Sequence, residues 1–424
     1  MAGGSFPRTF VLAAAAVALL ARLAFGLGYW VNEALNRDEV EYLSLARSLT
    51  AGDGYRYDKH VEDGPVQPFG RAPGYPVFLA LIGAGREYVE RVPMNVKVAQ
   101  SFAGAIGVVL IAFAAFRLGG ERSAKAAAVL AAVHPPLIWI AGYAYSEAVF
   151  WPIGIALALL TSRAIETGAP PGATMTVWKR ALLLGAGAGI AILVRAATLL
   201  FVPLCGLYLI WKRQWITLAG LVLGLVLVLT PWTIRNINFY GHFVLVASDG
   251  GVTFWTGNNA LAPGEGDMAA NPHLKIANQK LRDQHPHLTE EQMEPIYYQE
   301  SLGWIRSHPG DFAWLMAKKV FYLIVPIGPS YQVHSARYYW ASVLSLAVLV
   351  PLAAVGGWRL GSERGRLVGM WLLAAAAIAT CLVFFPQERF RIPVIDPALI
   401  LLASGLWATR TWNDAQGGVN RRAA

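Results

Sequence analysis

The chain has 424 residues, of which 56% are hydrophobic and 14% charged, so it lies outside the range of soluble domains, in which about 25% are charged. Its net charge of +9 comes from Lys and Arg that cluster in short loops between apolar blocks, which favours a membrane protein over a nucleic-acid-binding one. Both cysteines, Cys205 and Cys381, lie in apolar segments, which excludes a disulfide framework.

The first apolar block covers residues 9–30 and is long enough to cross a hydrocarbon layer of about 30 Å. It ends on aromatic residues that suit a membrane interface, so we interpret it as an uncleaved span, with a cleaved signal peptide as the alternative. The polar stretch 31–94 follows as a first extracytoplasmic loop. Within it, a helical pattern begins at Asp38, and the short apolar run Tyr75–Ile82 predicts a helix in the interface.

Further apolar blocks predict spans at about 95–116, 126–143, 148–163, 181–196, 198–211, 215–231, 338–357, 367–385 and 394–409. The segment 312–327 carries two lysines in its middle, which favours an interfacial or re-entrant helix. Glycines at 185–189 predict close helix packing. The fold class is therefore an all-α polytopic membrane protein of about ten spans, with one domain at 1–412 and a polar cytoplasmic tail at 413–424. Cytoplasmic placement of the basic loops leaves 232–311 as a large extracytoplasmic loop.

Asp38 stands directly after the first span. At 3.6 residues per turn it lines up with Tyr42 and Leu45 on an inward face, whereas Glu41 falls on the opposite, polar face. An inward carboxylate is costly unless it has a partner or a task, and one facing a cavity could act as a general base on an acceptor hydroxyl. The alternative is that Asp38 and Glu41 form a capping box, and the two roles are compatible.

Glu147 lies where two apolar helices meet with almost no loop between them, flanked by Tyr143 and Tyr145. It either starts a helix after Ser146 or forms part of a cavity wall near Asp38, and the sequence does not decide between these.

Basic residues on the outer side are the next clue, because the positive-inside bias depletes them there. Forked arginine donors suit the phosphate of a lipid headgroup. The alternative is that unrelated side chains simply reach the headgroup region. The candidate phosphate ligands are Arg195, Arg235, Lys318, Lys319, Arg389 and Arg391.

Several segments, in order, carry a family likeness: RDEVEYLSLARSLTAGDGY, RAPGYPVFLALI, YSEAVF, LTPWTIRN and ERFRIPVIDPAL. Together they resemble the GT-C glycosyltransferases, in the branch of protein O-mannosyltransferases and aminoarabinose transferases (glycosyltransferase family 39-like). The resemblance implies a GT-C-like bundle in the bacterial inner membrane, with its active site on the extracytoplasmic side. It also implies a polyprenyl-phosphate sugar donor, a lipid, glycan or protein acceptor, and inversion at the anomeric carbon, with Asp38 as base and Glu39 and Glu147 shaping the site.

The donor sugar and the acceptor are not identified by the sequence. The candidate substrate-binding residues are Tyr42, Tyr55, Tyr143, Trp255 and Asn258. No cofactor is demanded, although a divalent metal bridging the phosphate, as in oligosaccharyltransferases, stays open. The alternative functions are a transporter or flippase of lipid-linked sugars, which should show repeated halves, and a non-catalytic assembly subunit.

Overall fold

The computed structural model describes residues 5–409 except 62–68, 167–174, 267 and 333–334, and every regular element within these ranges is a helix. The all-α prediction is confirmed. Six of the described helices are long and apolar enough to cross a membrane, or seven when one bent pair counts as a span, so the count of ten is not confirmed. The predicted tail at 413–424 lies outside the described residues.

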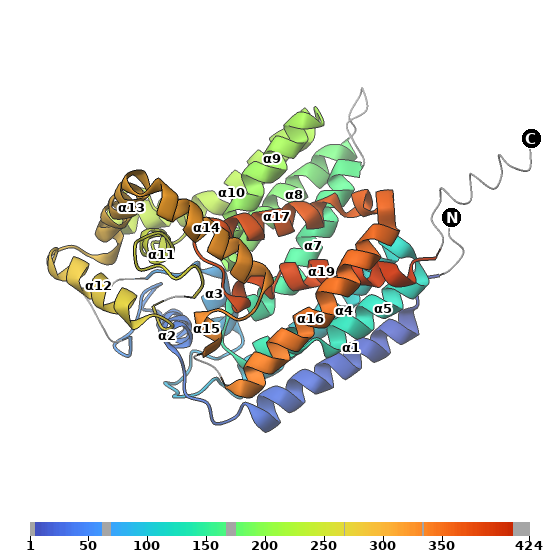
Figure 1. The fold of residues 1–424 in the computed structure, drawn as a ribbon, viewed down its shortest axis with the longest axis horizontal. Helices are drawn as coiled ribbons and strands as arrows, with labels where there is room; N and C mark the ends of the chain where they lie inside the picture. Colours follow the sequence, from blue (N-terminus) through green and yellow to red (C-terminus); the bar gives the residue numbers. More distant parts are fainter. Residues whose placement is uncertain (1–4, 62–68, 167–174, 267, 333–334, 410–424) are drawn as a thin grey trace, which may run out of the picture.

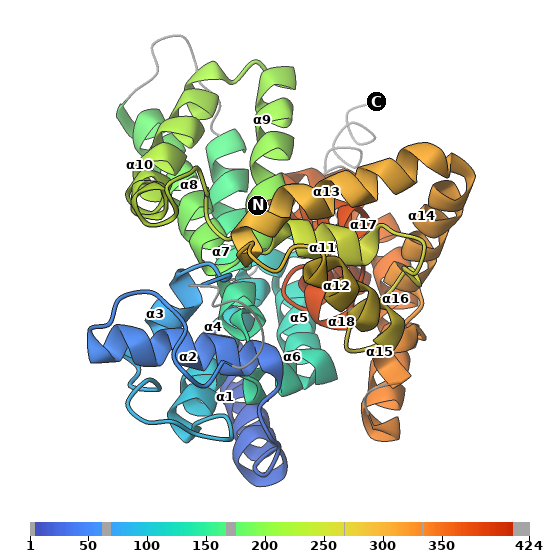
Figure 2. The same ribbon diagram turned by 90° about the vertical axis from the view of Figure 1, so that its left-hand side faces the viewer.

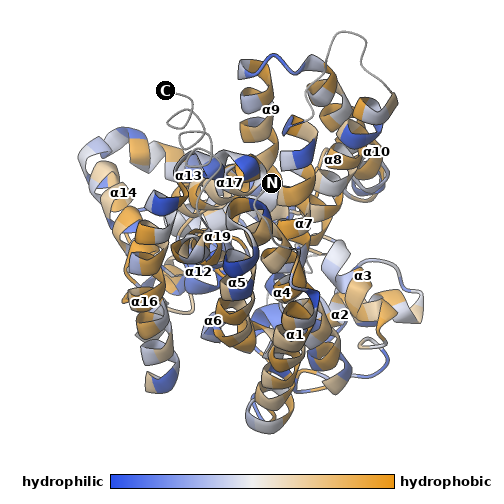
Figure 3. Ribbon diagram, turned by 90° about the vertical axis from the view of Figure 1, so that its right-hand side faces the viewer, coloured by the Kyte–Doolittle hydropathy of each residue, from blue (hydrophilic) through white to orange (hydrophobic). Residues whose placement is uncertain are grey.

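Each predicted span nevertheless falls on a helix. The bundle extends across the right of Figure 1. Its helices are α1 (Arg8–Leu23), α4 (Met94–Gly119), α5 (Glu121–Val133), α7 (Ser146–Glu166), α8 (Met175–Val194), α9 (Phe201–Trp211), α10 (Trp215–Tyr240), α16 (Ala336–Leu360), α17 (Val368–Val383) and α19 (Ile395–Ser404). Figure 3 shows that apolar residues dominate outward-facing helices such as α1 and α16, as a lipid-facing surface requires.

Two of the predicted span boundaries differ from those of the structure. The span predicted at 126–143 is broken by 61° between α5 and the short α6 (Pro135–Trp139), because proline lacks the N–H that would continue the helix. The predicted end of the last span before the long loop, at residue 231, was wrong. Instead α10 continues to Tyr240 and stops at Gly241, whose φ of 73° gives a left-handed cap.

Glycines hold α8 against α10, as the 185–189 pattern predicted. A Cβ on Gly185 would lie 2.2 Å from the carbonyl oxygen of Leu221, and one on Gly224 would lie 2.4 Å from that of Leu182. The two backbones therefore touch, which only residues without a side chain permit.

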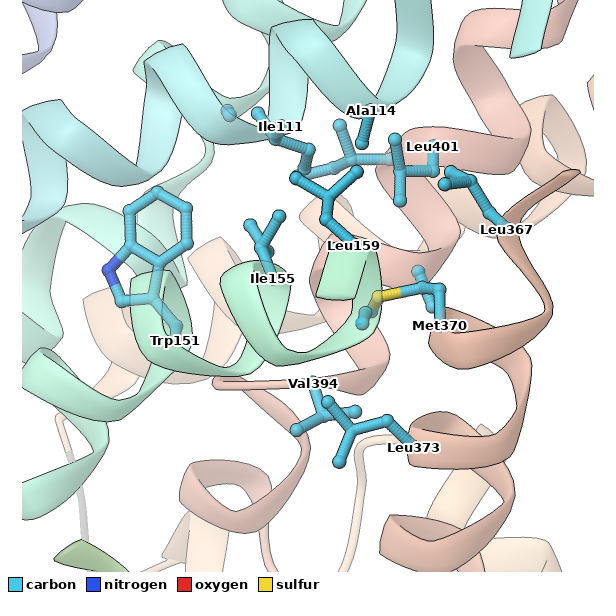
Figure 4. Close-up of a cluster of buried hydrophobic side chains, with 14 of the residues drawn as sticks. Ile111, Ala114, Trp151, Ile155, Leu159, Leu367, Met370, Leu373, Val394 and Leu401 are labelled. Atoms are coloured by element: carbon cyan, nitrogen blue, oxygen red, sulfur yellow. The ribbon is translucent and has the colours of Figure 1, made fainter. Parts of the chain in front are cut away.

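The largest buried apolar cluster surrounds α7 (Figure 4). Trp151, Ile155 and Leu159 of this helix pack against Ile111 of α4 and Leu373 of α17. Such contacts fix the start of α7, which carries Glu147.

The polar end of the molecule is built from shorter helices. Figures 1 and 2 show α11, α12 and α13 gathered at one end of the bundle, near α2. The helices predicted from Asp38 and over 75–82 are confirmed as α2 and α3. The bounds are α2 (Arg37–Ala51), α3 (Gly74–Leu81), α11 (Gly250–Gly257), α12 (Pro272–Asp283), α13 (Glu290–Ser307), α14 (Pro309–Ile324), α15 (Pro329–Gln332) and α18 (Glu388–Arg391).

Candidate active site

The start of α2 is capped by Asn36 and Glu39. The Asn36 side chain accepts from the backbone N–H of Glu39, whose carboxylate in turn accepts from the backbone N–H of Asn36 at 3.0 Å. The capping box predicted for Asp38 and Glu41 was therefore wrong. Because the cap lies two residues earlier, the carboxylate of Asp38 is free to form other contacts.

Asp38 is held between two arginines from distant parts of the chain. Arg71 Nη2 donates to Asp38 Oδ1 at 2.6 Å, and Arg389 Nη1 donates to Asp38 Oδ2. Burial alone would raise the pKa of Asp38, but the positive charges of Arg389 and Arg71 outweigh it and hold this pKa well below its usual range. The result, without a bound donor, is an ionised carboxylate at neutral pH with a guanidinium group on each oxygen.

Glu41 does not face solvent, contrary to the helical-face prediction. It is buried, and its Oε2 accepts from Arg71 Nε at 2.7 Å while Oε1 accepts from Arg37 Nε at 3.2 Å. Residues following α2 fold back over this face: the backbone N–H of Asp58 donates to Ser44 Oγ at 2.6 Å. Both faces of α2 are thus covered, which helical periodicity cannot reveal.

Glu147 lies in the first turn of α7 and also close to α2, so both of its proposed roles are compatible with the structure. Arg195, at the end of α8, lies 2.9 Å from Glu147 Oε1. Ser146 bridges them to α2, because its hydroxyl lies 3.3 Å from Arg195 Nη1 and accepts from the Tyr42 hydroxyl at 3.5 Å. A second acid–arginine pair therefore stands beside the Asp38 cluster.

The short helix α18 sends its two arginines in opposite directions. Residues two apart on a helix point about 200° apart. Arg389 reaches Asp38, whereas Arg391 is buried against Asp396 Oδ1 at 3.1 Å, with His134 Nε2 2.9 Å from Asp396 Oδ2. Arg391 thus forms internal ion pairs away from Asp38.

Lys319 and Asn258 are likewise engaged elsewhere. Lys319 Nζ donates to Asn258 Oδ1 at 2.9 Å and to two backbone carbonyls at 3.0 and 2.6 Å, so all three of its donors are used. Trp255 packs in an apolar cluster with Tyr297. Lys318 forms no hydrogen bond or ion pair with the described residues. The structure does not bring these four predicted ligands to Asp38.

Tyr55 and Tyr143 support the arginines indirectly. The Tyr55 hydroxyl donates to the backbone carbonyls of Arg71 at 2.9 Å and Ala72 at 3.0 Å. Tyr143 stacks parallel to Tyr145, whose ring centroid lies 5.1 Å from the guanidinium carbon of Arg389. They hold the arginines in place.

Arg235 is separate from this cluster. Its guanidinium group lies over four aromatic rings and donates to the Tyr55 carbonyl at 2.9 Å, and it forms no hydrogen bond or ion pair with Asp38, Arg71 or Arg389.

Arg71 was not among the residues predicted from the sequence. It bonds two carboxylates of α2 and lies 3.6 Å from Asp249. The available signal was its position on the predicted outer side, in RAPGYPVF, where the charge bias disfavours arginine.

Within the described residues, no group of three or more His, Cys, Asp or Glu side chains gathers closely enough to hold a metal ion. At Asp38 both carboxylate oxygens already accept from guanidinium groups, which stand where a divalent cation would coordinate. The donor set of this site therefore does not fit a divalent metal.

No protein-family model matches the sequence, and no curated protein matches it. Solved structures do match. The oligosaccharyltransferase of Archaeoglobus fulgidus in its apo form superposes with a TM-score of 0.58 and 13% identity, over 94% of this chain and 50% of that chain. The chain has the GT-C fold.

The same oligosaccharyltransferase, tethered to an acceptor peptide containing an NVT sequon, gives a TM-score of 0.56 at 13% identity, over 95% of this chain and 50% of that one. ArnT from Cupriavidus metallidurans, bound to undecaprenyl phosphate, gives only 0.38 at 16% identity, over 95% of this chain and 78% of that chain. The present chain thus spans about half the length of the oligosaccharyltransferase, and the likeness establishes the fold alone.

Proposed function

We propose that the chain is a membrane glycosyltransferase that moves a sugar from a polyprenyl-phosphate-linked donor to an acceptor hydroxyl, with Asp38 as general base. The observation that carries the proposal is the Asp38 carboxylate held by Arg71 and Arg389, at the polar end of a GT-C bundle. It unites one base with cations suited to a leaving phosphate.

A low pKa of Asp38 in the protein without donor is compatible with a role as general base, because the donor competes for the two arginines that lower it. The phosphodiester of the donor offers Arg71 and Arg389 a competing anion, whose negative charge grows as polyprenyl phosphate leaves, and forked guanidinium groups bind phosphate well. As they turn toward the phosphate, Asp38 loses their stabilising charge and its pKa rises toward the ordinary value. The carboxylate therefore becomes a better base when the donor is bound.

The reaction follows with balanced atoms. The acceptor oxygen attacks the anomeric carbon and passes its proton to Asp38, while the bond from that carbon to the phosphate oxygen breaks. The leaving polyprenyl phosphate takes the bonding electrons, and Arg71, Arg389 and Arg195 stabilise its charge. A single displacement gives inversion.

We place the site on the extracytoplasmic side of a bacterial inner membrane. Ser146 and Glu147 open α7 beside Asp38, whereas Glu166 ends it beside Arg117, with the ion pair at the far end of the helix. The basic loops around Arg117 therefore lie at the opposite end of α7 from Asp38, and the positive-inside bias assigns that far end to the cytoplasm.

The test is transfer of labelled sugar by the purified protein in nanodiscs, supplied with a panel of polyprenyl-phosphate sugars. The mass of lipid-linked intermediates that accumulate in a deletion strain would identify the donor sugar. Asp38→Asn should abolish transfer, whereas the matched change Glu121→Gln, in an exposed pair with Lys125 at the other end, should not. Normal turnover by Asp38→Asn would disprove the base assignment, and the absence of transfer from every donor would disprove the activity.

A further inference from the structure

Arg235 lies at the depth of lipid headgroups. It stands twenty positions after Trp215, the first residue of the membrane-crossing α10. At 1.5 Å per residue this is about 30 Å, the thickness of the hydrocarbon layer. With Trp215 at one surface, the guanidinium group of Arg235 therefore reaches the phosphates of the opposite leaflet.

The positive charge of Arg235 has no carboxylate partner among the described residues. Its hydrogen bonds go to the Tyr55 carbonyl at 2.9 Å and to Asn236 Oδ1 at 3.4 Å. Guanidinium has five N–H donors, so several remain for an anion. The rings of Phe69 and Phe239 lie 4.5 Å from its central carbon and hold the group in place, which reduces the entropy lost on binding.

A groove opens at this group. It has a volume of about 430 Å³ and is lined by Pro231, Ile234, Arg235, Asn238 and Phe239. Ile234 and Phe239 are exposed apolar residues, as are Val226 and Leu227 further along the same helix. The groove thus joins an apolar, lipid-facing wall to one fixed positive charge.

We infer that this groove binds the headgroup phosphate of an anionic phospholipid, with Arg235 as its ligand and the apolar wall against the acyl chains. The complementarity is of charge and depth: an unpaired cation stands at the level of the phosphates, on a surface that faces lipid.

The groove is distinct from the Asp38 site. Arg235 bonds the backbone carbonyl of Tyr55, whereas the phenol end of the same residue bonds the carbonyl of Arg71. The length of the Tyr55 side chain therefore separates the two. For this reason we assign Arg235 a bilayer lipid and not the donor phosphate that its sequence position suggested.

The test is native mass spectrometry of the full chain in detergent, with phosphatidylglycerol, phosphatidylcholine or undecaprenyl phosphate added. Arg235→Gln should bind phosphatidylglycerol about tenfold more weakly or worse, the effect of losing one charged hydrogen bond. Arg235→Lys, which keeps the charge without the fork, should be intermediate. The control is Lys212→Gln. Lys212 lies between α9 and α10, at the opposite end of α10 from Arg235, with its ammonium group over the Trp211 ring. It lines no part of the groove.

The inference stands if wild type retains phosphatidylglycerol over phosphatidylcholine, and if Arg235→Gln loses that preference while Lys212→Gln keeps it. Equal losses in both variants would overturn it, as would unchanged binding by a folded Arg235→Gln protein. A variant that loses undecaprenyl phosphate but keeps phosphatidylglycerol would return Arg235 to the donor site. Failure of the wild type to bind undecaprenyl phosphate would count against the proposed transferase and leave the phospholipid result intact.

Discussion

Arg71 binds Asp38 and Glu41 at once: its Nη2 lies 2.6 Å from Asp38 Oδ1, and its Nε lies 2.7 Å from Glu41 Oε2. One residue of the Pro- and Gly-rich loop before α3 thereby fixes two carboxylates one turn apart on α2. Glu41 neutralises part of the positive charge of Arg71 and orients its guanidinium group, so that the Nη2 donor points at Asp38. The geometry of the proposed base therefore depends on Arg71.

Arg71→Gln should shift the acid limb of the activity profile to higher pH. Asp38 must be ionised to accept a proton, and the charge of Arg71 lowers its pKa, so removing that charge raises this pKa by about one unit or more. The measurement is the dependence of kcat for sugar transfer on pH, which reports the complex with the donor bound. Arg37→Gln is the control, since Arg37 is exposed and bonds Glu41 only, and it should leave the limb in place. An unshifted limb in Arg71→Gln would show that Asp38 is not the titrating base.

Glu39→Gln should flatten the dependence of stability on pH. Burial raises the pKa of Glu39 to about 7, despite the backbone N–H groups of Asn36 and Ala144 that favour its charged form. Because the folded-state pKa exceeds the unfolded value, the stabilisation by Glu39 is complete below pH about 4.5 and is lost as pH rises through about 7. Glutamine does not titrate, and its amide oxygen keeps one of the two acceptors that bond the backbone N–H groups of Asn36 and Ala144.

The check is the melting temperature in detergent between pH 5 and 8. Wild type should lose stability across this range, and Glu39→Gln should lose clearly less of it. Asp53→Asn is a control, because Asp53 is an exposed acid beyond the end of α2, with only Arg56 nearby at 3.8 Å. Parallel curves for wild type and Glu39→Gln would contradict the raised pKa.

Much of this architecture could be predicted because membrane burial leaves a strong signal in sequence. Each apolar block became a helix, and the glycines at 185–189 did mark close backbone packing. The candidate base Asp38 was identified through its position after the first span. By contrast, Glu41 was misplaced because only the loop that returns over α2 buries it, and such coverage has no local pattern.

The six predicted phosphate ligands show more clearly that tertiary contacts leave no local pattern in the sequence. Six were grouped by predicted side of the membrane, yet only Arg389 bonds Asp38, and Arg195 joins the neighbouring Glu147. Arg391 was grouped with Arg389 although two positions on a helix reverse the direction of the side chain. Topology predicts the depth of a charge in the membrane. The partners of Asp38 follow instead from tertiary contacts, since Arg71 lies 33 positions from it in the chain and Arg389 lies 351.

Gly185→Ala should destabilise the bundle although alanine favours helices. A Cβ there would lie 2.2 Å from the Leu221 carbonyl oxygen, a backbone atom that cannot give way without separating α8 from α10. We expect a loss of about 1–3 kcal/mol, seen as a lower melting temperature. Gly303→Ala is the matched control, because a Cβ on Gly303 within α13 meets no neighbouring atom, and it should be neutral or stabilising by up to about 1 kcal/mol.

Asp396→Asn should destabilise the protein strongly and also displace Arg389. Asp396 is fully buried between Arg391 and His134 and is the closer of two carboxylates paired with Arg391, so its neutralisation weakens a buried ion pair at about 3–5 kcal/mol. Because Arg391 anchors the four-residue helix that carries Arg389, the loosened helix should bind the donor phosphate less well.

The two effects can be separated by the triple variant Glu388→Met, Arg391→Met and Asp396→Leu, since replacing a whole buried ionic triad by apolar residues is often neutral for stability. Melting temperature should recover in this variant, whereas the affinity for undecaprenyl phosphate should stay below that of the wild type, because α18 has lost its directional anchor. Full recovery of both would show that the triad contributes stability alone. A wild-type melting temperature in Asp396→Asn would instead mean that Arg391 is already compensated by Glu388, 3.5 Å away.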